Sequence, residues 1–209
     1  MKQGCKSLHE LLWARPRHRF PVNVDEIPLN GIYALFEKGE KGHGGDRIVR
    51  VGTHTGCGNL RSRLREHFVT ENKDRSIFRK NIGLALLNKA GDHFLSQWEI
   101  DLTTRAARET YGSKVDKERL HEVERQVSRF IQVAFSFAVL PISDKEDRRY
   151  FESAMISTIS MCKECRPSKS WMGNHSTKER IRESGLWQIQ GLYKTPLSRQ
   201  DIDRLRTVE

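Results

Sequence analysis

The stretch NGIYALF, residues 30–36, indicates the centre of the fold. Both alternating faces of residues 32–36 are apolar, which is typical of a strand that is covered on both sides. A second strand is predicted over residues 47–53, after the Gly-rich polar loop of residues 39–46. The two strands are therefore expected to form an antiparallel hairpin with an enlarged turn.

A helix is predicted directly after this hairpin. Asn59 is a favoured N-cap residue, and Leu60, Leu64 and Phe68 follow it at helical spacing. A third strand is expected over residues 133–140. Further helices are expected over residues 7–14, 79–87, 113–131, 145–162 and 178–183.

Length and composition favour one globular domain. A chain of 209 residues fits a single domain with insertions, and 36% hydrophobic with 31% charged residues fits a soluble protein. The sequence contains no apolar run near the roughly 20 residues that span a bilayer and no apolar signal core after its first lysines. These features argue against a membrane or secreted protein and favour a cytoplasmic one.

The charge balance points to a polyanionic partner. The 37 basic and 27 acidic residues give a net charge of +10. Residues 61–80 and residues 163–182 each carry +4, and together they supply +8 of this charge. Clustered surface charge is the simpler interpretation, and a surface that follows a phosphate backbone is the functional one.

Several polar residues stand out, although each has an ordinary explanation. Tyr33 lies within a strand and could be a packing residue. Arg63 and His67 lie one turn apart on one helix face. Glu152 borders the apolar face of its helix, where a carboxylate needs a cation or hydrogen-bond donors; a salt bridge and a metal site are both open. Asn174 lies in a stretch where a turn role is the default.

Taken in order, four segments resemble the successive motifs of the GIY-YIG nuclease superfamily. They are GIY at residues 31–33, RVG at 50–52, NLRSRLREHF at 59–68 and ESAMI at 152–156. The resemblance implies an α/β (α+β) fold in which a three-stranded antiparallel sheet is flanked by helices.

The resemblance also divides the single domain of residues 1–209. The catalytic core covers about residues 29–68 and 133–176. Residues 69–131 then form a mostly helical insertion, and residues 177–209 form a C-terminal extension.

The resemblance implies a role for each matched residue in phosphodiester hydrolysis. Tyr33 helps to activate the water, His67 relays its proton, and Arg63 stabilises charge on the phosphate. Glu152 holds a divalent metal, for which Mg²⁺ or Mn²⁺ is expected. Asn174 is the candidate for an asparagine that family members often carry near the scissile phosphate.

The second motif departs from the family pattern at Arg50, which replaces a tyrosine. Arginine can donate to phosphate but cannot accept a proton near neutral pH. Base catalysis is then expected to rest on Tyr33 and His67.

The leading hypothesis is a metal-dependent DNA endonuclease of a restriction or stand-alone type. It would act as a homodimer or in two events to cut both strands. The alternative is a non-catalytic nucleic-acid-binding protein with a degenerate site. DNA contacts are predicted from Arg61, Arg65, Lys73, Arg75, Arg79, Lys80, Lys169, Lys178 and Arg180.

The cysteines are too few and too unevenly spaced for a disulfide scaffold. Cys162 and Cys165 form a C-x-x-C pair with no second pair. Cys57 and His175 could complete a zinc site only if the fold happened to bring them close. Reduced thiols are the simpler expectation.

Overall fold

The computed structural model describes residues 2–208, with every side chain in that range except that of Lys2. Its centre is an antiparallel sheet with the strand order β1-β4-β2-β3. The strands are β1 (His18–Arg19), β2 (Ile32–Gly42), β3 (Gly45–Gly52) and β4 (Phe135–Leu140). The sheet therefore has four strands, and the expectation of three was wrong. The additional strand β1 has only two residues, which is too short to show alternation in the sequence.

Helices surround this sheet. They are α1 (Lys2–Trp13), α2 (Leu60–Phe68), α3 (Ile77–Ala90), α4 (Leu95–Glu99), α5 (Arg105–Tyr111), α6 (Lys117–Ala134), α7 (Lys145–Ser160), α8 (Glu179–Ser184) and α9 (Arg199–Arg206). Short 3-10 segments are η1 (Val24–Glu26), η2 (Gly112–Lys114) and η3 (Met172–His175). Helix α6 begins after Asp116, whose side chain accepts from the Arg119 amide, and not at residue 113. No helix within residues 2–208 has the length and apolar character to cross a membrane.

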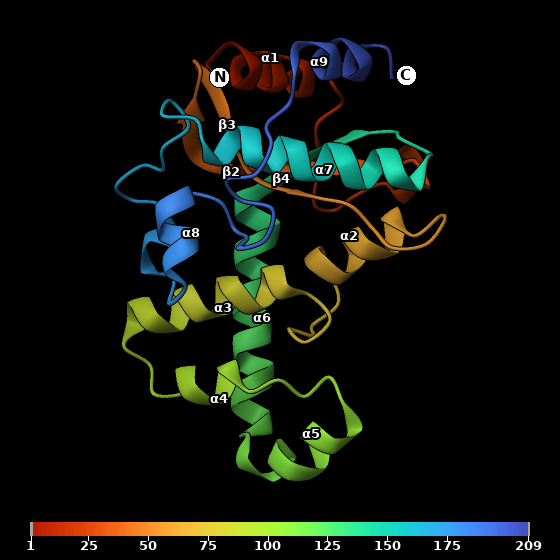
Figure 1. Cartoon of the computed structure of the whole chain (residues 1–209). Coiled ribbons are helices and arrows are strands. Elements are labelled where there is room, and N and C mark those ends of the chain that lie inside the picture. Colours follow the sequence, from red (N-terminus) through yellow and green to blue (C-terminus); the bar gives the residue numbers. More distant parts are fainter. Residues whose placement is uncertain (1, 209) are drawn as a thin grey trace.

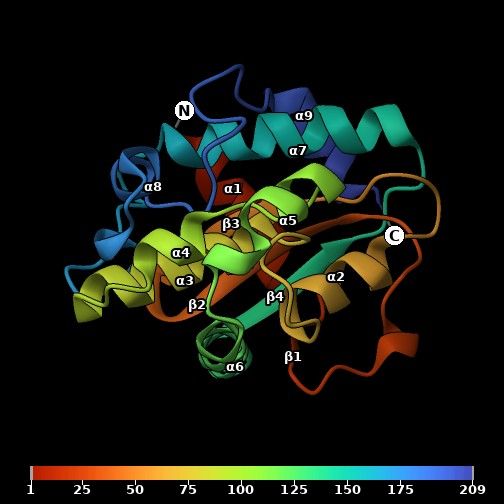
Figure 2. The ribbon, with the colours of Figure 1, turned by 90° about the horizontal axis from the view of Figure 1, so that it is seen from below.

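Strand β2 contributes to two cores. Ile32 and Ala34 pack in the core that α1, α7 and α9 share, whereas Tyr33 and Leu35 pack in the core that α2, α3 and α6 share. Figure 1 shows α1 and α9 above the sheet and α6 below it, and Figure 2 shows α6 end-on. Residues 32–36 are all buried, so the prediction of a strand covered on both sides is confirmed.

The β2–β3 hairpin is longer than the sequence indicated. Residues 39–46 are not a polar loop, because β2 continues to Gly42 and β3 begins at Gly45. His43 and Gly44 form the two-residue turn, with φ of 53° and 87°. Positive φ at both positions is the pattern of a type I′ turn, which matches the twist of the paired strands. The hairpin therefore projects His43 well away from the end of the sheet where Tyr33 lies.

Candidate active site

Tyr33 and His67 meet in the interior of the protein. The hydroxyl of Tyr33 lies 2.6 Å from Nε2 of His67, and Nδ1 of His67 lies 2.7 Å from Oγ of Ser76. Ser76 is the N-cap of α3 and also accepts from the Arg79 amide. With the His67 ring proton donated to Ser76, Nε2 is free to accept the Tyr33 proton.

Gly52 makes this arrangement sterically possible. Tyr33 pairs with Gly52 across the β2–β3 ladder. A Cβ added at Gly52 would lie 2.3 Å from the Tyr33 oxygen. The glycine of the second motif therefore leaves the space that the Tyr33 hydroxyl occupies.

Burial determines the protonation of His67. The side chain is fully buried, and burial is the main cause that lowers its pKa well below the usual value of 6.5. The positive charges of Arg50, Arg63 and Arg79 lower the pKa further. His67 is therefore neutral at neutral pH and can accept a proton.

Arg63 lies at the edge of the same site. Its Nη1 donates to Oε2 of Glu66 at 2.9 Å and to the carbonyl oxygen of Arg75 at 3.0 Å. Its side chain is 26% exposed and lines a pocket of 460 Å³ that Thr53 also lines. The guanidinium is therefore positioned and accessible to an anion.

Arg50 is held more deeply than Arg63. Its Nη1 donates to the Trp187 carbonyl oxygen at 2.6 Å, and its guanidinium lies 5.4 Å from the centre of the Phe78 ring. Its Nε is buried and has no hydrogen-bond partner. A buried donor without a partner is costly. Arg50 itself is buried and, unlike Arg63, does not line the pocket.

Glu152 reaches the site from α7. The amide of Thr53 donates to Oε1 of Glu152 at 3.0 Å, and Thr53 directly follows Gly52. Burial raises the pKa of Glu152 above its usual value, while the charge of Arg50 opposes that shift. The Glu152 carboxylate therefore binds the residue that follows Gly52, and Gly52 is the glycine against which the Tyr33 hydroxyl packs.

The structure does not bring Asn174 to these residues. Its Nδ2 donates to the carbonyl oxygens of Ser168 and Lys169. Ser168 in turn donates to Glu40, which lies seven residues beyond Tyr33 on β2. Asn174 therefore stabilises its own loop. That loop contacts β2 at Glu40, toward the opposite end of β2 from Tyr33.

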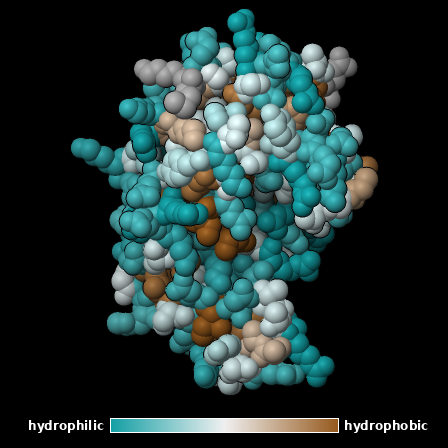
Figure 3. Space-filling view, viewed as in Figure 1, coloured by the Kyte–Doolittle hydropathy of each residue, from teal (hydrophilic) through white to brown (hydrophobic). Residues whose placement is uncertain are grey.

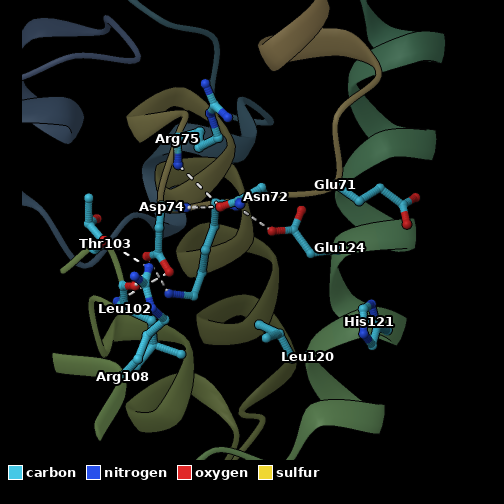
Figure 4. Close-up of a pocket in the computed structure, with 11 residues that line it drawn as sticks. Glu71, Asn72, Asp74, Arg75, Leu102, Thr103, Arg108, Leu120, His121 and Glu124 are labelled. Carbon is cyan, nitrogen blue, oxygen red and sulfur yellow. Dashed lines mark hydrogen bonds and ion pairs between the residues drawn. The ribbon is translucent and has the colours of Figure 1, made fainter. Parts of the chain in front are cut away.

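Two predicted DNA contacts are corrected because their side chains are buried in ion pairs. Arg79 is fully buried and donates to Glu124 of α6 at 2.6 Å. Lys73 is 2% exposed and pairs with Asp74 at 2.7 Å. Figure 4 shows Asp74 and Glu124 in a pocket that is lined by both acidic and basic side chains. Arg79 and Lys73 therefore stabilise the insertion.

The other side chains predicted to contact DNA are more exposed than Lys73 and Arg79. Arg65, Arg75, Lys169 and Arg180 are exposed, and Arg61, Lys80 and Lys178 are half-buried. Some of these side chains are paired: Arg75 with Glu66 at 3.2 Å, and Lys178 with Glu99. Figure 3 shows that the face drawn there is largely hydrophilic, with apolar atoms exposed near its middle.

Three residues of the site were not anticipated from the sequence. Ser76 orients His67, Glu66 holds Arg63, and Thr53 anchors Glu152. Ser76 could have been found as the N-cap of the helix that begins at residue 77. Nothing in the local sequence indicates the other two roles.

One comparison with known proteins gives a match. A family model described as GIY-YIG domain matches residues 17–208. The match includes residues 69–131 and most of the C-terminal part, which the sequence motifs had left outside the common core. No curated protein and no solved structure matches the chain.

Proposed function

The chain belongs to the GIY-YIG domain family, whose members are generally endonucleases, and we propose that it is a metal-dependent DNA endonuclease. The observation that carries this proposal is the contact of 2.6 Å between the Tyr33 hydroxyl and His67. A buried tyrosine with a neutral histidine as its acceptor suits proton transfer better than DNA binding alone.

Tyr33 and His67 activate the attacking water in this proposal. The Tyr33 oxygen takes a proton from the water as its own proton passes to Nε2 of His67. The low pKa of His67 keeps the acceptor unprotonated before the reaction. Ser76 holds the ring in the orientation that this transfer needs.

Arg63 and Arg50 stabilise the charge that develops on the phosphate. Arg63 lines the pocket together with Arg75, so an entering phosphodiester can reach its guanidinium. Arg50 lies deeper and adds a second positive charge, which acts on both His67 and Glu152. Fixed donors aimed at developing charge are typically worth 10²–10³-fold in rate per donor, roughly 3–4 kcal/mol.

Glu152 is the residue that would hold the metal. A single carboxylate fits Mg²⁺, which takes one or two protein carboxylates and completes its shell with water and phosphate oxygens. The Thr53 amide binds Oε1, which leaves Oε2 of Glu152 as the ligand atom. When bound, Mg²⁺ or Mn²⁺ would polarise the phosphate and stabilise the leaving oxygen.

The proposal also leads to expectations about how the protein contacts DNA and how many chains cut it. The exposed cations of α2 and of the segment around Lys169 would contact the phosphate backbone. With one site in each chain, cutting both strands would require a homodimer or two separate events.

Plasmid nicking tests the proposal. Purified wild type should nick supercoiled DNA in Mg²⁺, and Glu152→Gln and Tyr33→Phe should each lower the rate by at least about 100-fold. The matched control is Glu146→Gln, which changes an exposed carboxylate on the same helix.

The outcome also separates the two functional hypotheses. Tight, salt-sensitive DNA binding without cleavage in Mg²⁺ or Mn²⁺ would instead identify a binding protein. Unchanged cleavage by Glu152→Gln would contradict the assignment of the metal ligand.

A further inference from the structure

A second cluster of reactive side chains lies on the other face of the sheet. It contains Cys5 and His9 from α1, His43 from the β2–β3 turn and Cys165 from the segment after α7. One ligand atom from each residue lies within 4.8 Å of the other three. We propose that these four side chains bind a structural zinc ion.

Two of the distances between ligand atoms match those of a tetrahedral zinc site, and all four atoms lie within 4.8 Å of one another. Zn–S bonds of about 2.3 Å and Zn–N bonds of about 2.0–2.1 Å place neighbouring ligand atoms roughly 3.3–3.8 Å apart. The Cys5 and Cys165 sulfurs are 3.6 Å apart, and Nε2 of His9 lies 3.7 Å from the Cys165 sulfur. Two thiolates and two neutral imidazoles form one of the common structural donor sets for zinc.

The outer contact of His9 fits the same role. Zinc-bound histidines almost always donate their second ring N–H to a carbonyl or a carboxylate. His9 donates from Nδ1 to the Cys5 carbonyl oxygen at 2.9 Å. Nδ1 of His43 lies 3.1 Å from Oε2 of Glu164, at ion-pair distance but without hydrogen-bond geometry. In His9, Nε2 is the nitrogen that faces the Cys165 sulfur.

One backbone contact competes with the metal. The Ile48 amide donates to Nε2 of His9 at 3.2 Å, a long hydrogen bond that zinc coordination would replace. The helical spacing of Cys5 and His9 places both side chains on one face of α1.

The ligand set differs from the one that the C-x-x-C pair suggested. Cys57 is exposed, and neither Cys57 nor His175 belongs to the cluster. The Cys162 sulfur lies 3.4 Å from Nε2 of His43 but is not one of the four ligands. Cys165 is the one member of the pair in the site.

A metal here would join three segments that are far apart in the sequence. Figure 1 shows α1 beside the far end of the β2–β3 hairpin. Trp13 of α1 also donates to the Asp46 carbonyl oxygen at 2.9 Å, so the helix already docks on this hairpin. The cluster belongs to the core opposite that of Tyr33, so its role is structural and independent of the proposed nuclease activity.

Metal analysis and Co²⁺ substitution test the site. Protein purified with reductant and without chelator should hold one zinc ion per chain. Co²⁺ added to the zinc-free protein should give the intense visible bands of a tetrahedral site and a thiolate charge-transfer band. Cys5→Ser and Cys165→Ser should lose both signals, whereas Cys57→Ser and Cys162→Ser should keep them.

His43→Gln provides a milder variant, because it changes a turn residue and leaves α1 intact. It should fold and bind Co²⁺ more weakly. A wild type that holds no zinc and shows no tetrahedral Co²⁺ spectrum would overturn the proposal. A Cys5–Cys165 disulfide in protein prepared with zinc and reductant would also overturn it, as would metal loss from Cys162→Ser alone.

Discussion

The imidazole of His67 is fully buried beside three arginines, and this environment keeps it neutral. In the unfolded chain the same group has a pKa of about 6.5. Below that pH the unfolded state binds the proton and the native state does not. Protonation therefore favours unfolding, and His67 costs the native state stability as the pH falls below about 6.5.

A pH series should detect this coupling. The free energy of unfolding of the wild type should fall relative to His67→Gln by up to about 1.4 kcal/mol per pH unit below about pH 6.5. Urea denaturation at about pH 7 and about pH 5.5 measures the difference between the two proteins.

His93→Gln is the matched control, because His93 is exposed. It should keep the wild-type dependence on pH. A difference between wild type and His67→Gln that stays constant with pH would contradict the assignment of a buried neutral His67.

At this scale, the sequence indicated the chemistry but not the pairing of the side chains. Tyr33 and His67 were identified from their motifs, and the structure places them in contact. Lys73 and Arg79 were counted as phosphate contacts from their charge alone. Their partners Asp74 and Glu124 make them buried ion pairs, and Glu124 lies 45 residues away from Arg79.

Among the elements, the β2–β3 pair sets the geometry of the candidate site. The ladder places Tyr33 opposite Gly52, and the next residue, Thr53, anchors Glu152. One hairpin therefore positions both the tyrosine and the proposed metal ligand.

Gly52→Ala should disrupt this geometry. The new Cβ would lie 2.3 Å from the Tyr33 oxygen and 2.5 Å from its ring carbon Cζ, and the buried ring has no space to retreat. Overpacking of this kind typically costs about 1–3 kcal/mol of stability. Nicking should fall by at least about tenfold, since a shift of the hydroxyl breaks the contact with His67.

Gly112→Ala is the control for this substitution, because no atom lies within 4 Å of the Cβ that it would add. Nicking and urea denaturation of both variants provide the comparison. Wild-type cleavage by Gly52→Ala would show that the hydroxyl position is not critical.

The elements also show where periodicity is insufficient. β3, β4 and α6 have clear patterns and appear within a few residues of their expected bounds, whereas β2 continues past residue 36 to Gly42. Residues 39–46 were expected to be a loop because they are polar and rich in glycine. Beside the type I′ turn at His43 and Gly44, Lys41 pairs with Asp46 and Gly42 with Gly45, so the turn aligns the two strands.

On the scale of the whole molecule, the net charge of +10 overstates the cations that are free to meet DNA. Lys73 and Arg79 are buried, and Arg63 and Arg75 share the carboxylate of Glu66. Arg65 remains exposed on α2, so it is a better candidate for a phosphate contact.

Salt dependence of DNA binding should distinguish these cations. Arg65→Ala should lower the slope of log K against log salt by about one unit. The control Arg206→Ala, on α9, should leave the slope unchanged. Glu152→Gln serves as the background for both, so that the DNA is not cut during titration. Equal slopes for the Arg65→Ala and Arg206→Ala proteins would exclude Arg65 from the interface.

The sequence by itself determined the order of the motifs, the residues that match them, and a central strand covered on both sides. These properties depend on local patterns, because side-chain type and periodicity act over a few residues. Only the tertiary structure decided which charges are buried, which partners orient Arg63 and His67, and that Cys5 meets Cys165 across 160 positions. Burial and pairing depend on contacts between distant segments, and such contacts leave no regular spacing in the chain.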